Sequence, residues 1–174
     1  NARWTWPARA SNTAQPPSGR VDPSGRWVAI PDLGADRLHL ASYEPISGEL
    51  TLRHRANVAP GGGPRHLVFH PTNGCLYLFT EMDTAIYVFG FDQQSGELSF
   101  KQKTCLLPKA LLERAEIQGA EIQISPDGKI CICQCAWLLQ ERARPDFPVD
   151  DQRTRWKRTF ACLLSVWRKM SANV

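Results

Sequence analysis

Short apolar runs alternate with turn residues through the middle of the chain. The clearest unit has such runs at about 66–69, 75–80, 85–91 and 97–102, rich in Val, Leu, Ile, Tyr and Phe. Pro, Asn, Asp and Gly separate the runs, as at 71–74. Runs of this length and composition are typical of β-strands joined by tight turns. The pattern therefore predicts a unit of four antiparallel strands.

The same pattern recurs along the chain with a fixed period. Pro23 and Pro71 are 48 residues apart, and so are Gly48 and Gly96. A third copy begins with Ser-Pro-Asp-Gly at 125–128 and is then lost. Repeats of about 40–50 residues with four antiparallel strands each are typical of β-propeller blades. We therefore predict an all-β fold, a partial β-propeller of about two to three four-stranded blades. A different all-β repeat, such as a sandwich, is the alternative.

Three polar side chains lie at the ends of two neighbouring runs. Arg65 and His66 begin one run, Glu81 follows the next, and the turn at 71–74 joins the two. If the runs pair as a hairpin, the three residues meet at its far end. In a propeller blade this end borders the mouth of the central channel. A guanidinium, an imidazole and a carboxylate together suit a small anionic substrate. A purely structural ion pair between Arg65 and Glu81 is the alternative.

Residues 20–133 resemble the seven-bladed propeller lactonases, a family that includes propeller-type 6-phosphogluconolactonases and carboxymuconate-lactonizing enzymes. The matching motifs are Asp-Pro-Ser-Gly-Arg (22–26), Pro-Asp-Leu-Gly-Ala-Asp (31–36), Gly-Pro-Arg-His (63–66), His-Pro (70–71), Thr-Glu (80–81), Ala-Glu-Ile (120–122) and Ser-Pro-Asp-Gly (125–128).

This resemblance implies a lactone hydrolase that acts on a small anionic lactone such as 6-phosphogluconolactone. An activity of the carboxymuconate-lactonizing type is the alternative. The resemblance also places Arg65 and Glu81 in the active-site cleft. Arg65 is then the substrate-binding residue, and Glu81 and its neighbour His66 are the catalytic residues. No cofactor and no metal are expected.

Two groups of the family pattern are missing from this chain. The family has a His-rich stretch just before Asp-Pro-Ser-Gly-Arg, where this chain reads Thr-Ala-Gln-Pro-Pro-Ser-Gly-Arg at 13–20. The family has an Asn-Arg pair after the strand that follows Ser-Pro-Asp-Gly, where this chain reads Gln-Cys-Ala at 134–136. Removing one of several catalytic groups that act together can cost most of the reaction rate. We therefore expect little or no activity from the chain itself. A non-catalytic, truncated propeller that serves as a binding scaffold is the alternative.

The length also limits the architecture, because 174 residues cannot form seven blades of about 45 residues each. Open blade edges and uncovered faces predict marginal stability and self-association. Residues 1–19 and the basic, Trp-containing segment 134–174 do not match the family. We interpret both as products of a shifted frame, a retained intron or a faulty gene model; ordinary divergence is the alternative. The net charge of +4 arises in these flanks, so it does not indicate a nucleic acid partner.

Residues 154–171 place apolar side chains at helical spacing among Arg and Lys, which predicts an amphipathic helix in the C-terminal segment. Such a helix can lie on a membrane surface or in a partner's groove. We expect it to pack on its own domain or to be a frame artefact. No run is apolar and long enough to span a bilayer, and the first residues lack the core of a signal peptide. A cytoplasmic location follows by default.

The Cys and His residues show no metal-binding pattern. Cys131, Cys133 and Cys135 alternate along a predicted strand, so all three face one side. This is not the Cys-x-x-Cys spacing of structural zinc, and we expect buried thiols. Of the other residues, His54 is expected at the surface and His70 in its turn.

Overall fold

The computed structural model describes residues 18–108, 117–137 and 159–162, which form strands and turns in three antiparallel sheets. Blade A comprises β1 (Arg20–Val21), β2 (Trp27–Asp32), β3 (Arg37–Glu44) and β4 (Glu49–Asn57). Blade B comprises β5 (Pro64–Phe69), β6 (Cys75–Thr80), β7 (Ala85–Phe91) and β8 (Leu98–Cys105). Blade C comprises β9 (Ile117–Ile124), β10 (Cys131–Trp137) and β11 (Thr159–Cys162). Over these residues, no helix is long and apolar enough to cross a membrane.

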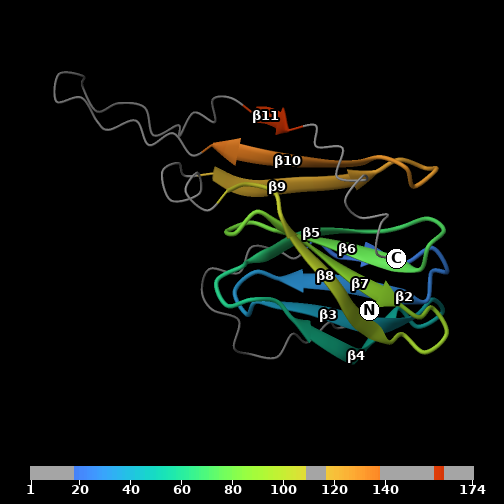
Figure 1. Ribbon diagram of the computed structural model, residues 1–174. Coiled ribbons are helices and arrows are strands. Elements are labelled where there is room, and N and C mark those ends of the chain that lie inside the picture. Colours follow the sequence, from blue (N-terminus) through green and yellow to red (C-terminus); the bar gives the residue numbers. More distant parts are fainter. Residues whose placement is uncertain (1–17, 109–116, 138–158, 163–174) are drawn as a thin grey trace, which may run out of the picture.

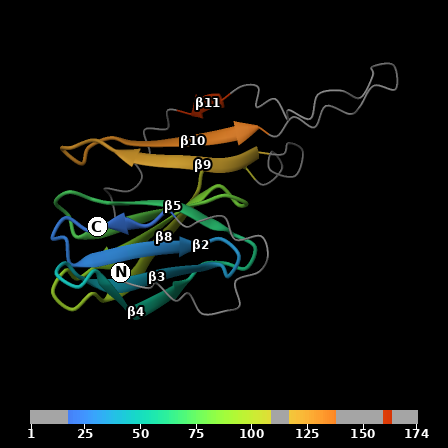
Figure 2. The ribbon, with the colours of Figure 1, turned by 180° about the vertical axis from the view of Figure 1, so that it is seen from behind.

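The three blades stack face to face with blade B in the middle, as both the front view (Figure 1) and the view from behind (Figure 2) show. Strands in blades A and B follow one another in sequence order across each sheet. The first strands of successive blades lie next to each other, β1 beside β5 and β5 beside β9. This arrangement confirms the predicted all-β, partial propeller.

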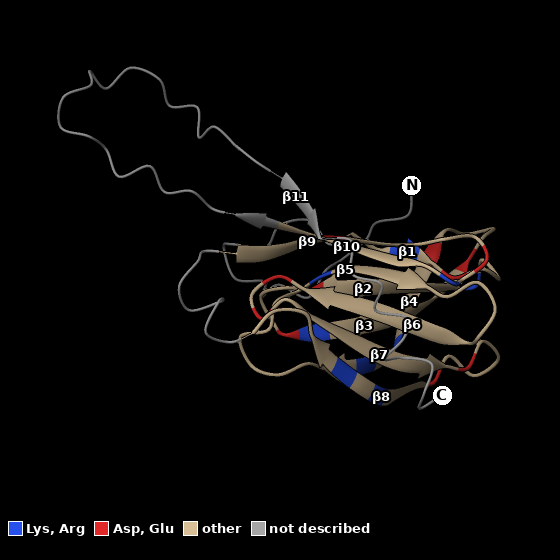
Figure 3. Cartoon of the chain, turned by 45° about the horizontal axis from the view of Figure 1, so that its top comes forward, with Lys and Arg blue, Asp and Glu red and all other residues tan. Residues whose placement is uncertain are grey.

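Blade B is buried on both faces because it has a neighbour on each side. Every residue of β6 and β7 is buried. One apolar cluster joins blade B to blade A, and a second joins it to blade C. The outermost strands β4 and β8 are mostly exposed and carry Lys and Arg, whereas the middle strands β6 and β7 of blade B carry no charged residue (Figure 3). Charged side chains on an outer strand oppose edge-to-edge pairing with other chains.

The sequence repeat is also a repeat of backbone geometry. The pairing of β3 with β4 shifts register between Leu40 and Ala41, and that of β7 with β8 shifts between Val88 and Phe89, at the same 48-residue offset. The turns before β2, β6 and β10 are closed by equivalent backbone hydrogen bonds. These join Asp22 N to Trp27 O, His70 N to Cys75 O, and Ser125 N to Ile130 O. The third copy therefore retains its turn and its first hairpin.

Equivalent turn residues, Asp22 and His70, connect each blade to the next. Both are buried, with exposed fractions of 3% and 6%. The Asp22 carboxylate accepts backbone N–H groups of its own turn and the Nε2–H of Gln93 in blade B. Burial by itself raises the pKa of Asp22, but these hydrogen bonds outweigh it and lower that pKa. His70 Nδ1 accepts two backbone N–H groups, so Nε2 carries the proton and donates to Gly128 O in blade C at 3.1 Å.

Trp27 forms a further contact between blades A and B. Its indole Nε1–H donates to Gln93 O at 3.0 Å, and its ring lies against Gly96. Gly96 has a φ of 74°, and a Cβ added there would collide with the Trp27 ring. Glycine is thus required at 96 both for its backbone conformation and for the space it leaves.

The strands of blade C test two sequence predictions. Cys131, Cys133 and Cys135 are all buried, as predicted, in the cluster shared with blade B. Within the predicted helix at 154–171, residues 159–162 are instead extended and pair with β10. An exposed β10 edge offers unpaired backbone groups, which an extended segment can satisfy and a helix cannot. The rest of 154–171 lies outside the described residues.

We predict that Gly96→Ala destabilises the protein more than Gly25→Ala. Both glycines have a φ near 73°, so both substitutions introduce the same backbone strain of about 1–2 kcal/mol. A Cβ added at Gly25 would meet no atom within 4 Å, whereas one added at Gly96 would collide with the Trp27 ring. Overpacking should add about 1–3 kcal/mol at Gly96 alone. Urea unfolding followed by Trp fluorescence measures the difference, and equal midpoints would show that the Trp27 contact does not tie the blades together.

Candidate functional site

The inner strand of blade B is interrupted at Arg65. Pro64 lies opposite Thr80 and His66 lies opposite Phe79, so Arg65 is an extra residue without a partner in β6. Opposed residues on paired strands share a face, and consecutive residues of a regular strand lie on opposite faces. His66 therefore lies on the same face as Phe79, which packs toward blade C, and the bulge leaves Arg65 as the unpaired residue before it. Val68, two residues later, packs in the same cluster, so the bulge changes the alternation only before His66.

Arg65 pairs with Glu81 at this bulge. Arg65 Nη1 lies 2.5 Å from Glu81 Oε2, and the two side chains are 32% and 10% exposed. The Arg65 carbonyl accepts a hydrogen bond of 2.7 Å from Ser18 Oγ, which fixes the bulged backbone. The pair is a charge-assisted hydrogen bond with the guanidinium partly open to solvent, so a small solute can reach that cation.

The backbone on both sides of the Glu81 carboxylate is held by neighbouring strands. Glu81 N donates to Gly63 O at 2.7 Å, and Glu81 O accepts from Gly119 N of blade C at 2.8 Å. Thr84, in the turn that follows, has a φ of 44°. This conformation is rare for a β-branched residue and indicates a turn that its surroundings constrain.

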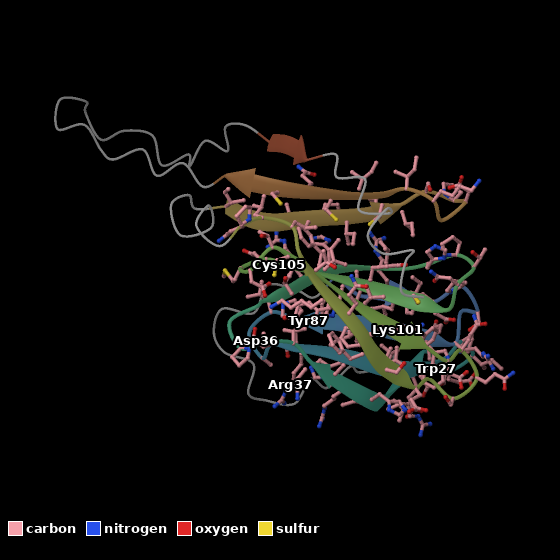
Figure 4. All side chains as sticks on the ribbon, viewed as in Figure 1. Trp27, Asp36, Arg37, Tyr87, Lys101 and Cys105 are labelled. Atoms are coloured by element: carbon pink, nitrogen blue, oxygen red, sulfur yellow. The ribbon has the colours of Figure 1, made fainter. Side chains whose placement is uncertain are left out.

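Blade A supports the loop that leads into Arg65. Asp36 accepts backbone hydrogen bonds from Gly61 N at 2.7 Å and from Gly63 N at 2.9 Å. Gly63 has a φ of 63°, which favours glycine. Figure 4 places Asp36 at the end of the sheets opposite to Trp27, so the site and the Trp27 contact lie at different ends of the blades.

The inner strand of blade C has an irregularity of the same kind at Ala120. Glu121 lies opposite Gln134 and Gly119 lies opposite Cys135, so Ala120 is the extra residue. Bulges of this kind redirect side chains and are common beside active sites. The two inner strands that meet at Glu81 are thus both bulged.

The second bulge decides where the Glu121 side chain lies. Ile117 before the bulge and Ile122 after it both belong to the apolar cluster between blades B and C. In a strand without a bulge, residues 117 and 121 would share a face. Glu121 would then enter the apolar cluster, where an unpaired carboxylate is strongly unfavourable. The bulge keeps this carboxylate at the edge of the cluster, where it is 34% exposed.

His66 lies between charges of both signs. Its Nδ1 is 3.4 Å from Glu121 Oε2. Burial lowers the pKa of His66 below the ordinary value of 6.5; Glu121 opposes this shift, Arg65 and Arg20 add to it, and Glu81 opposes it more weakly. His66 is therefore neutral at neutral pH, with one ring nitrogen that can donate and one that can accept a hydrogen bond.

The predicted residues Arg65, His66 and Glu81 lie together where blades B and C meet. Their roles as catalytic and binding residues stay predictions. Glu121 and Arg20 join them and were not predicted. Ala-Glu-Ile at 120–122 was noted only as a motif, and no sequence pattern signals the contact of Glu121 with His66. In the described part of the chain, no three His, Cys, Asp or Glu side chains are arranged to hold a metal ion.

The two family groups missing from the sequence fall at different places. Gln134, where the family has its Asn-Arg pair, lies on β10 opposite Glu121. Residues 13–17, where the family has its His-rich stretch, lie outside the described residues. The described site therefore contains two pairs of side chains. In one, the guanidinium of Arg65 contacts the carboxylate of Glu81, and in the other, the imidazole of His66 contacts the carboxylate of Glu121. Such a set can bind an anion, orient a water molecule and move a proton.

Comparison with known proteins places this geometry in a family. Residues 7–133 match the family described as lactonase, 7-bladed β-propeller. The chain is 33% identical to the 6-phosphogluconolactonase of Pectobacterium carotovorum over 114 residues, which cover 64% of this chain and 33% of that protein. It is 31% identical to the 6-phosphogluconolactonase of Bacillus subtilis over 107 residues, which cover 62% of this chain and 30% of that protein.

A solved structure shows the same relationship. The periplasmic gluconolactonase of Pseudomonas aeruginosa superimposes with a TM-score of 0.62 at 26% identity, over 71% of this chain and 34% of that one. The chain thus spans about a third of the length of the curated relatives it matches. With the family match over residues 7–133 and the stacked four-stranded blades, the chain belongs to the seven-bladed β-propeller lactonase family.

Proposed function

We propose that this chain forms one wall of the active site of a lactone hydrolase, with 6-phosphogluconolactone as the substrate. The observation that carries the proposal is the Arg65–Glu81 ion pair, set beside a neutral His66 at the junction of two blades. The relatives named 6-phosphogluconolactonase support the choice of substrate. A phosphorylated sugar lactone carries the negative charge that a partly exposed guanidinium binds well.

Hydrolysis of a lactone needs a positioned water and stabilisation of the oxyanion that forms at the carbonyl. In this proposal Arg65 binds the phosphate of the substrate or the developing oxyanion. Glu81, held by its backbone contacts to blades B and C, orients the attacking water. A complete active site needs further groups. The family pattern places these groups on the His-rich and Asn-Arg segments that this chain lacks.

His66 is suited to carry the proton. As a neutral imidazole it can accept the proton of the attacking water and then pass it to the ring oxygen when the ester bond breaks. The water oxygen becomes part of the product carboxylate, and the former ring oxygen becomes a hydroxyl. His66 returns the proton that it accepts, and the second proton of the water stays on the new carboxyl group until that group ionises and releases it to solvent.

The activity of the carboxymuconate-lactonizing enzymes is the second candidate. Its substrates are also small anions, which Arg65 would bind by the same contacts. Assaying both lactone classes with the same preparation separates the candidates. Turnover of a muconate-derived lactone without turnover of 6-phosphogluconolactone would favour the second.

Arg65→Ala and Glu81→Gln should each lower the rate of lactone hydrolysis by about 10²–10³-fold, because each removes a group that acts on the reacting atoms. The rate is measured above the uncatalysed background by coupling release of 6-phosphogluconate to its oxidation. We expect low turnover from the chain itself because two family groups are missing, so high protein concentrations are needed. Arg65→Ala should also abolish calorimetric binding of 6-phosphogluconate.

Arg55→Ala and Glu49→Gln serve as matched controls, because both residues are exposed on β4, the outermost strand of blade A. They should hydrolyse and bind like the unaltered chain. Activity and binding that survive the double substitution at Arg65 and Glu81 would remove these residues from the site. Absence of 6-phosphogluconate binding by the unaltered chain would count against the proposed function itself.

The rate should also fall as the pH falls through the pKa of His66, which lies below 6.5. Protonated His66 cannot accept a proton, so kcat/KM should decline on the acid side of neutrality. The lowered pKa has a second consequence, because the unfolded chain binds the proton more readily than the folded one. Stability contributed by His66 is thus present above pH 6.5 and lost as the pH falls through the folded pKa. A kcat/KM that stays constant across the pH range in which the His66 ring itself titrates by NMR would argue against a proton-accepting role.

A further inference from the structure

We propose that Glu121 is a positioning residue for His66: its carboxylate accepts the Nδ1–H of His66 and leaves Nε2 as the proton acceptor of the site. The inference rests on the proposed function, and it goes beyond that function by assigning a role to the neighbouring blade. The observation behind it is the 3.4 Å separation of His66 Nδ1 and Glu121 Oε2 at the junction of blades B and C.

The Glu121 carboxylate is itself fixed in place. Its Oε1 accepts the backbone N–H of Ile122 at 3.0 Å and the Nε2–H of Gln123 at 3.3 Å. The other oxygen, Oε2, faces His66. A carboxylate held through one oxygen presents the second in a defined direction, which is what orienting an imidazole requires.

Blade C is attached to blade B close to Glu121, through Gly119. Gly119 N donates to Glu81 O at 2.8 Å, and Gly119 lies so close to Thr80 O and the Phe79 ring that a Cβ would collide with both. The bulge at Ala120 follows directly, and Glu121 comes next. Strand β9 therefore contacts blade B at Gly119, and only the bulged residue Ala120 separates this contact from Glu121.

The charges around His66 distinguish Glu121 from a passive neighbour. Burial, Arg65 and Arg20 all disfavour the imidazolium that forms when His66 accepts a proton. Glu121 is the strongest group that acts in the opposite direction, and Glu81 is engaged by Arg65. A carboxylate at Nδ1 fixes the tautomer and stabilises the imidazolium that forms transiently. Both effects are needed for a buried histidine that moves a proton.

The experiment measures the tautomer and the pKa of His66 directly, by ¹⁵N NMR of histidine-labelled protein. The chain has four His residues, and a His66→Asn variant assigns the His66 signals. In the unaltered chain, Nδ1 should carry the proton. In Glu121→Ala, the signals should shift toward the Nε2–H tautomer and the pKa of His66 should fall further. Glu49→Ala, an exposed carboxylate on β4, is the control and should change neither.

Glu121→Gln keeps an oxygen for the Ile122 N–H and a side chain of the same size, so it remains folded if the smaller variant does not. It should lower the pKa of His66 because the charge is lost. Where lactone turnover is measurable, both variants should lower kcat/KM at pH 7 by at least about tenfold with little change in KM, and should move the acid limb to lower pH.

The outcomes separate the two proposals. Unchanged His66 signals and pKa in folded Glu121→Ala or Glu121→Gln protein would overturn the positioning role, whatever the activity. A changed His66 in a chain that hydrolyses neither lactone class would support the pairing and reject the proposed lactonase function. A changed His66 together with a shifted pH profile would support both.

Discussion

The site depends on a conflict between side-chain alternation and burial. Strand β5 lies between the two apolar clusters and β9 borders the one shared with blade B, so alternate residues of a regular strand enter a cluster. Charged side chains such as those of Arg65 and Glu121 have no place in either cluster unless the alternation is broken. One extra residue in each inner strand, Arg65 in β5 and Ala120 in β9, breaks it where the two strands meet.

The same architecture explains why the site belongs to two blades. Glu81 ends a strand of blade B, yet its carbonyl is bonded to Gly119 of blade C, and the loop before Arg65 is held by Asp36 of blade A. At the opposite end, Asp22, Trp27 and His70 repeat a contact from each blade to the next. The stacking of blades and the geometry of the site are therefore a single packing problem. Loosening the contacts between blades would displace the functional groups.

Much of this was readable in the sequence for local reasons. The turn glycines, the strand runs and the 48-residue period are encoded by neighbouring residues, and the first three strands of blade B match their predicted bounds to within two residues. The prediction that Arg65 and Glu81 meet is equally local, because a short turn joins their strands into a hairpin. The helical spacing at 154–171 was misleading for residues 159–162, because an open strand edge overrides an intrinsic pattern.

The sequence by itself determined the fold class, the blade repeat, the lactonase family and the meeting of Arg65, His66 and Glu81. Only the tertiary structure decided the bulges at Arg65 and Ala120, the ion pair between Arg65 and Glu81, and the pairing of His66 with a carboxylate 55 residues later in the chain. The reason is physical: a bulge is a mismatch between two strands, and a contact between blades depends on how separate sheets stack. Neither is written in the spacing of residues along a single strand.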